Sequence, residues 1–350
     1  MDNFVCLNGF ERYFMDLDLF LEILSIDSSS SMEGRLSDFL IRRLPVSGCE
    51  VNVYMSDRQP SASNIMLSWG RPDIVFCTHY DTVPPYIPPT VEKREDGKTV
   101  IRGRGACDAK GQLISMYEAC LELADRGEEG FGLLLLYGEE AGSLGAKEFR
   151  TKYEGGRYVI VGEPTDNRMV SASKGTKSFA VTIRGKSFHS GYPVYGASAV
   201  ERFIDMMNAL RSVDFPIDPK LGETTWNVGK LFSDNPQNIL SDHLTFRIYF
   251  RTTFASDAMV CEVMEKFRDE YIEVESFGGD TPAEYLTIDG FGTKTVAFGS
   301  DAPQLTNFRH KALCGPGSIL VAHTDAEYIL LDDLEQAKEN YIRIFDALKN

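Results

Sequence analysis

The sequence predicts an α/β protein with a mostly parallel central sheet and helices on both faces, interrupted by a smaller α+β domain. Three observations lead to this prediction. Several short runs consist almost only of apolar residues, helical spacing lies between two of them, and alternating strands begin after about residue 172. Apolar runs without alternation are typical of strands that are covered on both faces in a parallel sheet.

The first part of the chain, residues 1–173, carries three such runs. They are "DIVFC" (73–77), "GLLLLY" (132–137) and "YVIV" (158–161). Between the first two, apolar residues recur with helical spacing, and this stripe ends near Gly127. Its members are Leu113, Met116, Tyr117, Cys120, Leu121 and Ala124. Strands that alternate with helices in this way predict a doubly wound domain.

The middle part, residues 174–282, has a different pattern of apolar and polar residues. From His243 to Thr253 apolar and polar residues alternate, which predicts a strand with one buried and one open face. "FAVTIRG" (179–185) reads similarly, and helical patterns follow at about 197–211 and 257–271. We therefore expect an inserted α+β domain.

The last part, residues 283–350, returns to apolar runs. "TVAFGS" (295–300) and "SILVAH" (318–323) are followed by a closing amphipathic helix that begins near Leu334. The simplest arrangement is one discontinuous α/β domain that is completed by this segment.

Composition excludes several classes of partner. With 52 acidic and 36 basic residues, the net charge of −16 should repel nucleic acids and anionic membranes. The longest strongly apolar run, "FGLLLL", is far shorter than the roughly 20 residues that span a bilayer. Seven cysteines without C-x-x-C spacing indicate a reducing compartment, with Cys77 and Cys107 as buried apolar residues. We expect a cytoplasmic protein with no nucleic-acid or membrane partner.

Histidine and carboxylate residues follow the predicted strands. In open parallel sheets, ligands bind beyond the carboxyl ends of the strands, so these side chains should converge. A further carboxylate lies in a glycine-rich loop ahead of the first helix and can reach the same crevice. The set is His79, Asp81, Asp108, Glu139, Glu140, Glu163 and His323.

Histidine nitrogen combined with carboxylate oxygen suits zinc or a similar transition metal. The carboxylates are too many for one catalytic zinc and suit two metals that share a bridging carboxylate. Asp81 would accept the second ring proton of His79. Each motif alone also fits a purely structural role. His79 could be a hydrogen-bonded residue at the end of a strand, and Glu139 and Glu140 could lie in a solvated turn. The ordered series favours a metal site.

Six stretches together resemble the dinuclear zinc deacylases and exopeptidases, a family that includes acetylornithine deacetylase, succinyl-diaminopimelate desuccinylase, aminoacylases and glutamate-releasing carboxypeptidases. They are "THYDTVP", "GRGACDAKGQL", "YGEEAGSLGA", "VGEPT", "SFHSGYP" and "GPGSILVAHTDAEY". The resemblance covers the chain from about residue 15 to its end. It implies a zinc exopeptidase-like fold with a ferredoxin-like lid and dimerisation domain.

The resemblance also implies specific roles for the metal residues. His79, Asp108 and Glu163 would bind one zinc, and Asp108, Glu140 and His323 the other, with Asp108 bridging. Cobalt can substitute for zinc. Glu139 corresponds to the general base, and Asp81, the partner of His79, is counted with it among the catalytic residues.

Three residues of the inserted domain receive roles in the same way. His189 would reach the site of the neighbouring subunit in a homodimer and stabilise the oxyanion. Arg251, and more weakly Asn238, would hold the substrate's carboxylate. The alternatives remain a turn histidine for His189 and a surface charge for Arg251. His243 and His310 match no motif.

"VGEPT" and the chain length most resemble the acetylornithine and desuccinylase branch. The predicted activity is hydrolysis of an N-acyl-L-amino acid, with N-acetyl-L-ornithine of arginine biosynthesis as the first choice. N-acetylcitrulline, N-succinylornithine, N-succinyl-diaminopimelate and dipeptides are the alternative substrates. A non-catalytic metal-binding relative is the last alternative, which the presence of Glu139 disfavours.

Overall fold

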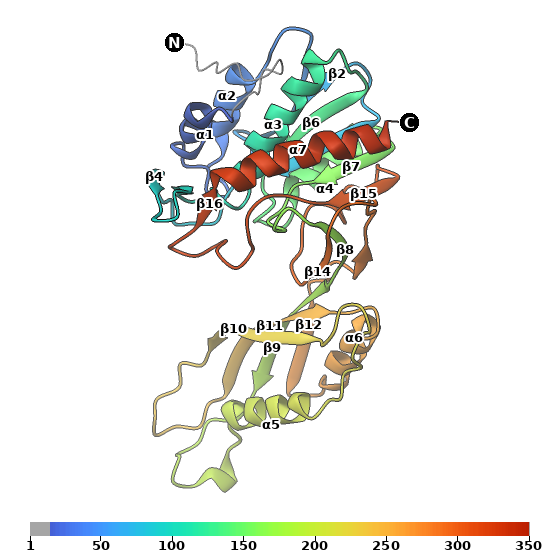
Figure 1. Cartoon of the computed structure of the whole chain (residues 1–350). Coiled ribbons are helices and arrows are strands. Elements are labelled where there is room, and N and C mark those ends of the chain that lie inside the picture. Colours follow the sequence, from blue (N-terminus) through green and yellow to red (C-terminus); the bar gives the residue numbers. More distant parts are fainter. Residues whose placement is uncertain (1–14, 350) are drawn as a thin grey trace. The chain divides into compact units, whose positions relative to one another are not determined.

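The structure, a computed structural model, describes residues 15–349. The chain forms two compact units (Figure 1). Unit 1 contains the residues up to Ser171 together with Tyr285–Lys294 and Ser300 to the C-terminus, and unit 2 contains Ala172–Glu284 and Thr295–Gly299. The three-segment division drawn from the sequence alone stays an interpretation.

A six-stranded sheet forms the centre of unit 1, in the order β1-β2-β6-β3-β7-β15. The last four are parallel, and β1 and β2 form an antiparallel edge beside β6. The predicted mixed, mostly parallel α/β sheet is therefore confirmed. The strands are β1 (Glu50–Met55), β2 (Ser63–Trp69), β3 (Ile74–His79), β6 (Phe131–Leu136), β7 (Tyr158–Val161) and β15 (His310–Leu313).

Helices cover the sheet of unit 1. The helices α3 (Lys110–Asp125) and α7 (Leu331–Leu348) lie side by side (Figure 1). Aromatic rings join α7 to the strands: Phe76 of β3 meets Tyr341 at a centroid distance of 5.6 Å, and Phe131 of β6 meets Phe345 at 5.5 Å. All six residues of β3 are buried, so both faces of this strand are covered. The remaining helices are α1 (Leu17–Leu24), α2 (Gly34–Arg43) and α4 (Leu144–Lys152).

Unit 2 has a four-stranded antiparallel sheet in the order β10-β11-β9-β12. Along the chain its elements run β-α-β-β-α-β, the ferredoxin-like pattern that the resemblance implied. Both helices contribute to the same apolar core as β9 and β11. The elements are β9 (Gly175–Arg184), α5 (Ala199–Arg211), β10 (Thr225–Phe232), β11 (His243–Thr252), α6 (Asp257–Lys266) and β12 (Ile272–Ser276).

Two predicted elements differ from the structure. "SILVAH" is a turn segment rather than a strand. The strand that joins the sheet is β15, which ends at Leu313, and Gly315, Pro316 and Gly317 separate it from this segment. The helix expected over 257–271 ends at Lys266, and β12 begins at Ile272. In the first place, a short apolar run did not distinguish a strand from a turn.

Short strands complete the molecule in two three-stranded sheets, β13-β8-β14 and β16-β5-β4. The second sheet pairs β16 with β5 antiparallel, which brings residues 328–330 beside residues 100–102. The strands are β4 (Thr90–Lys93), β5 (Thr99–Arg102), β8 (Met169–Ser173), β13 (Ala283–Glu284), β14 (Thr293–Val296) and β16 (Tyr328–Leu330). One 3₁₀ turn, Pro193–Tyr195, lies in unit 2.

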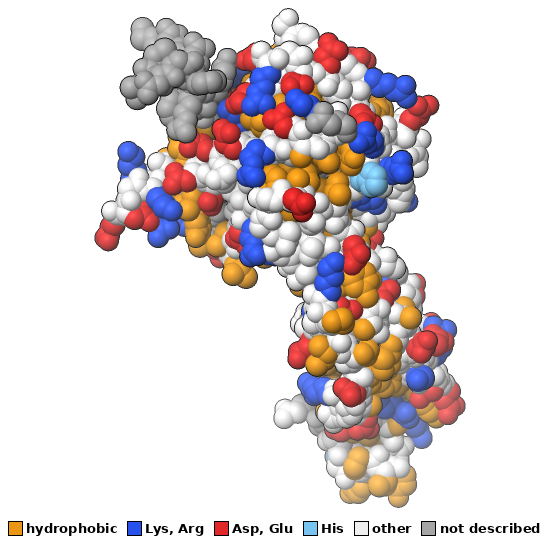
Figure 2. Space-filling view, turned by 45° about the vertical axis from the view of Figure 1, so that its right-hand side comes forward, with side chains coloured by type: hydrophobic (Ala, Val, Ile, Leu, Met, Phe, Trp, Pro, Cys, Tyr) orange, Lys and Arg blue, Asp and Glu red, His pale blue; other side chains and the backbone are white. Residues whose placement is uncertain are grey.

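The surface of unit 2 exposes several large apolar side chains, and Figure 2 shows hydrophobic side chains on the face of this unit that is in view. Tyr192, Val194 and Tyr195 belong to one loop, and Leu231 and Phe232 to the end of β10. Across residues 15–349, no helix has both the length and the apolar content needed to cross a membrane.

Strand β11 gives a direct test of the alternating pattern in unit 2. Phe246 is 1 % exposed and packs on Phe203 of α5, whereas Tyr249 on the opposite face is 40 % exposed. Phe246→Ala should lower the free energy of unfolding by about 3–5 kcal/mol. Tyr249→Ala should lower it by about 1 kcal/mol or less. Chemical denaturation measures both values, and equal losses would contradict the assigned faces.

Candidate metal centre

Three neighbouring parallel strands deliver side chains to one end of the sheet. His79 is the last residue of β3, Glu139 and Glu140 follow β6, and Glu163 follows β7. Because β3 lies between β6 and β7, the carboxyl ends of these strands are adjacent. This end of a parallel sheet is where ligands bind in open α/β folds.

Five side chains form two groups whose ligand atoms lie within 4.8 Å of one another. One group is His79, Asp108 and Glu163, and the other is Asp108, Glu140 and His323. Asp108 belongs to both. The structure thus brings together all five residues predicted to bind metal, including His323, whose predicted strand is a turn.

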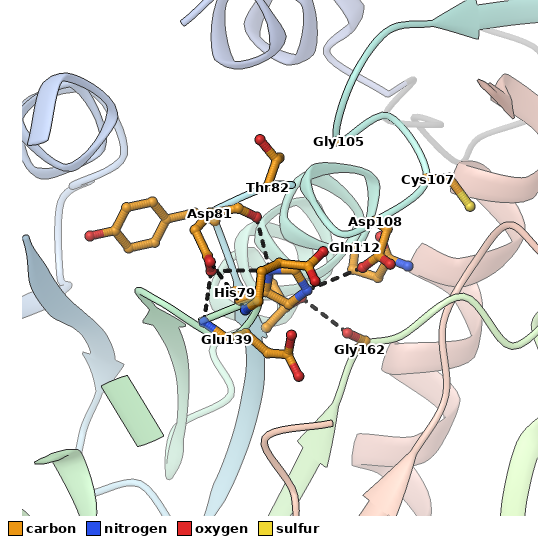
Figure 3. A network of polar contacts seen from close by, with 12 residues as sticks. His79, Asp81, Thr82, Gly105, Cys107, Asp108, Gln112, Glu139 and Gly162 are labelled. Carbon is orange, nitrogen blue, oxygen red and sulfur yellow. Dashed lines mark hydrogen bonds and ion pairs between the residues drawn. The ribbon is translucent and has the colours of Figure 1, made fainter. Parts of the chain in front are cut away.

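The carboxylate of Asp108 lies between the two histidines. Its Oδ1 is 3.1 Å from His79 Nε2, and its Oδ2 is 3.3 Å from His323 Nε2. His323 Nε2 is also 2.8 Å from Glu140 Oε1. Figure 3 shows His79 with Asp108 on one side and Asp81 on the other. One oxygen toward each histidine is the arrangement that a carboxylate bridging two metals needs.

Two observations show that the donor set fits metal ions. His79 Nδ1 lies 3.0 Å from the main-chain carbonyl of Asp81, which only accepts, so in the neutral ring Nδ1 carries the proton and Nε2 offers its lone pair. Glu163 is buried, and its Oε1 has no hydrogen-bond partner among residues 15–349. Such an atom is stabilised by a bound cation. The combination of imidazole and carboxylate suits zinc.

Asp81 is completely buried and organises the turn after β6. Its Oδ1 accepts the backbone N–H of Glu139 at 2.9 Å, and its Oδ2 accepts the backbone N–H of Glu140 at 3.2 Å and the hydroxyl of Ser30 at 2.8 Å. His79 Nδ1 is 3.4 Å from Oδ1, farther than from the Asp81 carbonyl. The Asp81 side chain therefore binds the backbone of both glutamates, and its main-chain carbonyl lies closer to His79 Nδ1 than its carboxylate does.

Charges inside the cluster shift the pKa values of both histidines. Hydrogen bonds to Asp108 and Glu140 raise the pKa of His323 to about 10. Burial acts to lower the pKa of His79, but its contacts with Asp108 and Asp81 raise it well above the ordinary value. The raised pKa values favour protonated rings, and a metal that binds these nitrogens must displace the protons.

Glu139 belongs to neither ligand group and has a different electrostatic environment. Burial raises its pKa well above the ordinary value of a glutamate. Asp301, a fully buried neighbour, has its pKa raised to about 7 by burial. A carboxylate whose pKa lies nearer to neutral is suited to accept and return a proton.

Four residues of this environment received no role from the sequence. Arg104 and Glu327 lie inside the quoted motifs "GRGACDAKGQL" and "GPGSILVAHTDAEY", so those motifs could have pointed to them. Ser30 stands in a run of serines, and Asp301 follows an ordinary glycine-serine pair, so neither carried a signal. Their roles come from contacts between distant parts of the chain.

The three residues predicted in the inserted domain lie in unit 2. The backbone N–H of Ser190, next to His189, donates to the carbonyl of Asn238 at 2.9 Å, so the structure brings these two segments together. Arg251 lies on β11 with its guanidinium 4.9 Å from the ring centroid of Tyr249. Their proposed roles in binding and catalysis stay predictions.

The unassigned histidines have different surroundings. His310 stacks on Tyr158 at a centroid distance of 5.2 Å, which is a packing contact. His243 is exposed at the start of β11.

Comparison with known protein families and curated proteins gives consistent matches. The family described as peptidase family M20/M25/M40 matches residues 75–347. A probable carboxypeptidase of Aspergillus oryzae is 31% identical, with 93% of this chain and 88% of that protein covered. A peptidase M20 domain-containing protein of Schizosaccharomyces pombe is also 31% identical, with 94% and 83% covered.

Solved structures show the same fold. A tripeptidase from Staphylococcus aureus superposes with a TM-score of 0.80 at 20% identity, covering 94% of this chain and 96% of that one. An M20 family metallo-carboxypeptidase from Sulfolobus solfataricus superposes with a TM-score of 0.72 at 16% identity, covering 95% and 98%.

Metal binding should release protons at pH 7, because contacts with carboxylates raise the pKa of His323 to about 10 and that of His79 well above its ordinary value. Calorimetric titration with zinc in two buffers of different ionisation enthalpy measures the number of protons. We expect heats that differ between the buffers, and an affinity that falls as the pH is lowered. His310→Ala should behave like the parent. Identical heats in both buffers would contradict the raised pKa values.

Proposed function

The chain belongs to peptidase family M20/M25/M40, and we propose that it is a dinuclear zinc hydrolase that cleaves an amide bond next to a free terminal carboxylate. One observation carries the proposal: Asp108 presents one carboxylate oxygen to His79 and the other to His323. In this proposal His79, Asp108 and Glu163 hold one ion, and Asp108, Glu140 and His323 hold the other. Cobalt can replace zinc in the same ligands.

Two bound ions would lower the pKa of a water and polarise the substrate carbonyl. Glu139 accepts a proton from that water while the oxygen of the water forms a bond to the carbonyl carbon. The same carboxyl group then donates the proton to the nitrogen as the carbon–nitrogen bond breaks. Asp81 keeps the Glu139 backbone in place through the N–H contact of 2.9 Å.

For the substrate, we propose short peptides first. Relatives at 31% identity over most of this chain are described as probable carboxypeptidases, and structures of the same fold include a tripeptidase and an aminopeptidase from Bacillus cereus. Arg251 suits the task of holding the terminal carboxylate, because its planar guanidinium forms paired hydrogen bonds. N-acetyl-L-ornithine, the first choice from sequence, becomes the alternative, since none of these relatives is described as acting on it.

A substrate panel separates these two possibilities. Zinc-loaded protein is incubated with unblocked dipeptides and tripeptides, with N-acetylated peptides, and with N-acetyl-L-ornithine, with a chelator-treated sample beside each. We expect chelator-sensitive release of an amino acid from the peptides. Turnover of acetylornithine alone would restore the sequence-based choice, and no hydrolysis of any amide would contradict the proposal.

Glu139→Gln should lower kcat by at least about 100-fold, because the amide cannot take up the proton of the water. Metal content should stay at the parental value, since Glu139 belongs to neither ligand group.

Two control variants show whether a loss of turnover in Glu139→Gln comes from the missing base or from lost metal. Glu140→Gln removes a proposed ligand and should lower both turnover and metal content. Glu95→Gln changes an exposed residue of the β4–β5 turn and should alter neither. Retained activity in Glu139→Gln would contradict the assigned general base.

We propose that His189 donates a hydrogen bond to the oxyanion in the neighbouring subunit of a homodimer. Its Nδ1 accepts the backbone N–H of Gly191 at 3.0 Å, so in the neutral ring the proton resides on Nε2, which is then a donor. Removing such a donor costs about 100-fold or more in kcat in other enzymes.

A mixture of two inactive variants tests whether His189 acts in the site of the neighbouring subunit. His189→Ala and Glu139→Gln subunits are each inactive in the proposal, but a mixed dimer has one site with an intact His189 and an intact Glu139. We expect activity to reappear on mixing, toward one quarter of the parental value if exchange is random. No recovery, with mixed dimers verified by mass, would contradict the role across subunits.

The cytoplasm remains the proposed location. Six cysteines of the described residues are unpaired thiols, which fits a reducing compartment.

A further inference from the structure

A buried ion pair forms hydrogen bonds with the backbone of Asp108 and of Thr324, the residue after His323. Arg104 Nη1 is 2.7 Å from Glu327 Oε2, and the two side chains are 2% and 1% exposed. Arg104 follows β5 and Glu327 precedes β16, and these strands pair antiparallel with Tyr328 opposite Arg102. The sheet pairing thus brings together two residues that are 223 positions apart.

Glu327 binds the loop that carries Asp108. Its Oε1 accepts the backbone N–H groups of Gly105 at 3.0 Å, Cys107 at 3.0 Å and Asp108 at 3.1 Å. Three donors that converge on one carboxylate oxygen fix the path of this loop, and the last of them belongs to Asp108 itself. The orientation of the proposed bridging ligand is therefore tied to Glu327.

Arg104 binds the segment that carries His323. Its Nη1 donates to the carbonyl of Thr324 at 3.1 Å, and its Nε donates to the carbonyl of Pro85 at 3.2 Å. Thr324 follows His323, whose φ of 62° lies in the left-handed region that a side chain other than glycine seldom adopts. Such a conformation persists where neighbouring contacts hold it. The Arg104 contact holds the adjoining peptide.

Stability alone does not explain a buried ion pair at this position. Taking two charges out of water is costly, and replacing a buried pair with apolar residues often leaves stability unchanged or improves it. What apolar residues could not supply is the set of directed hydrogen bonds to the backbone of Asp108 and Thr324. These bonds connect the ion pair to the backbone on both sides of the proposed metal pair.

We propose that Arg104 and Glu327 are positioning residues that hold Asp108 and His323 at the spacing required by two metal ions. The proposal rests on the proposed dinuclear site. It assigns a role to side chains that themselves bind neither metal nor substrate. Residues that orient metal ligands typically change metal affinity by about 10- to 100-fold when they are replaced.

The test is titration of the metal-free full chain with cobalt(II), followed through the visible absorption of the bound ion. Glu327→Gln keeps the size of the side chain but removes the charge that pairs with Arg104. We expect an affinity about 10- to 100-fold lower than that of the parent and an altered cobalt spectrum. The folded fraction of each sample is measured by circular dichroism, so the affinity is normalised to folded protein.

A matched control separates positioning from a general loss of an ion pair. Lys338 and Glu122 form another ion pair of 2.8 Å, with side chains 5% and 23% exposed, between α7 and α3. Glu122→Gln should bind cobalt with parental affinity and an unchanged spectrum. A loss equal to that of Glu327→Gln would overturn the proposal.

Arg104→Lys provides the second variant and decides the result if Glu327→Gln fails to fold. Lysine keeps the charge opposite Glu327 but cannot reach Thr324, Pro85 and Glu327 together. We expect weakened cobalt binding at nearly parental thermal stability. Parental affinity and spectrum in every folded variant would overturn the positioning role and leave the dinuclear site standing. Absence of cobalt binding by the parent would instead refute the dinuclear site on which the role depends.

Discussion

The arrangement of the centre depends on the carboxylate of Asp108. Its two oxygens face two histidines that reach it from different parts of the chain, at 3.1 Å and 3.3 Å. His79 is the last residue of a buried parallel strand, whereas His323 lies in a turn with a left-handed backbone. The position of Asp108 in space therefore decides whether the two groups of ligand atoms can act as one pair of sites.

Two buried carboxylates outside the ligand groups support this geometry in the same way. Asp81 accepts the backbone N–H groups of Glu139 and Glu140, and Glu327 accepts those of Gly105, Cys107 and Asp108. Each carboxylate thus positions a ligand or the proposed base through its backbone, which leaves the side chain of that residue available for chemistry. An uncompensated buried charge would be costly, and these N–H donors, together with Arg104 and Ser30, supply the hydrogen bonds that offset this cost.

The sequence predicted the parts of the centre that follow from local pattern. The apolar runs of β3, β6 and β7 predicted parallel strands, and the polar residues after each run were expected to meet because such strands end at one edge. The segment before His323 was predicted as a strand and is a turn, because a short apolar run does not fix its own conformation. The contacts of Ser30 and Glu327 could not be predicted, since each depends on packing between segments 51 to 223 residues apart. The resemblance to the family was informative about the ligands because the motifs contain them, but it did not identify the substrate.

The most direct test of the dinuclear centre is anomalous X-ray diffraction from crystals of the zinc-loaded protein, recorded on both sides of the zinc absorption edge. We expect two zinc peaks about 3.5–4 Å apart, one on each side of the Asp108 carboxylate. One peak should lie near His79 and Glu163 and the other near Glu140 and His323. A single peak, or zinc bound away from Asp108, would contradict the dinuclear centre.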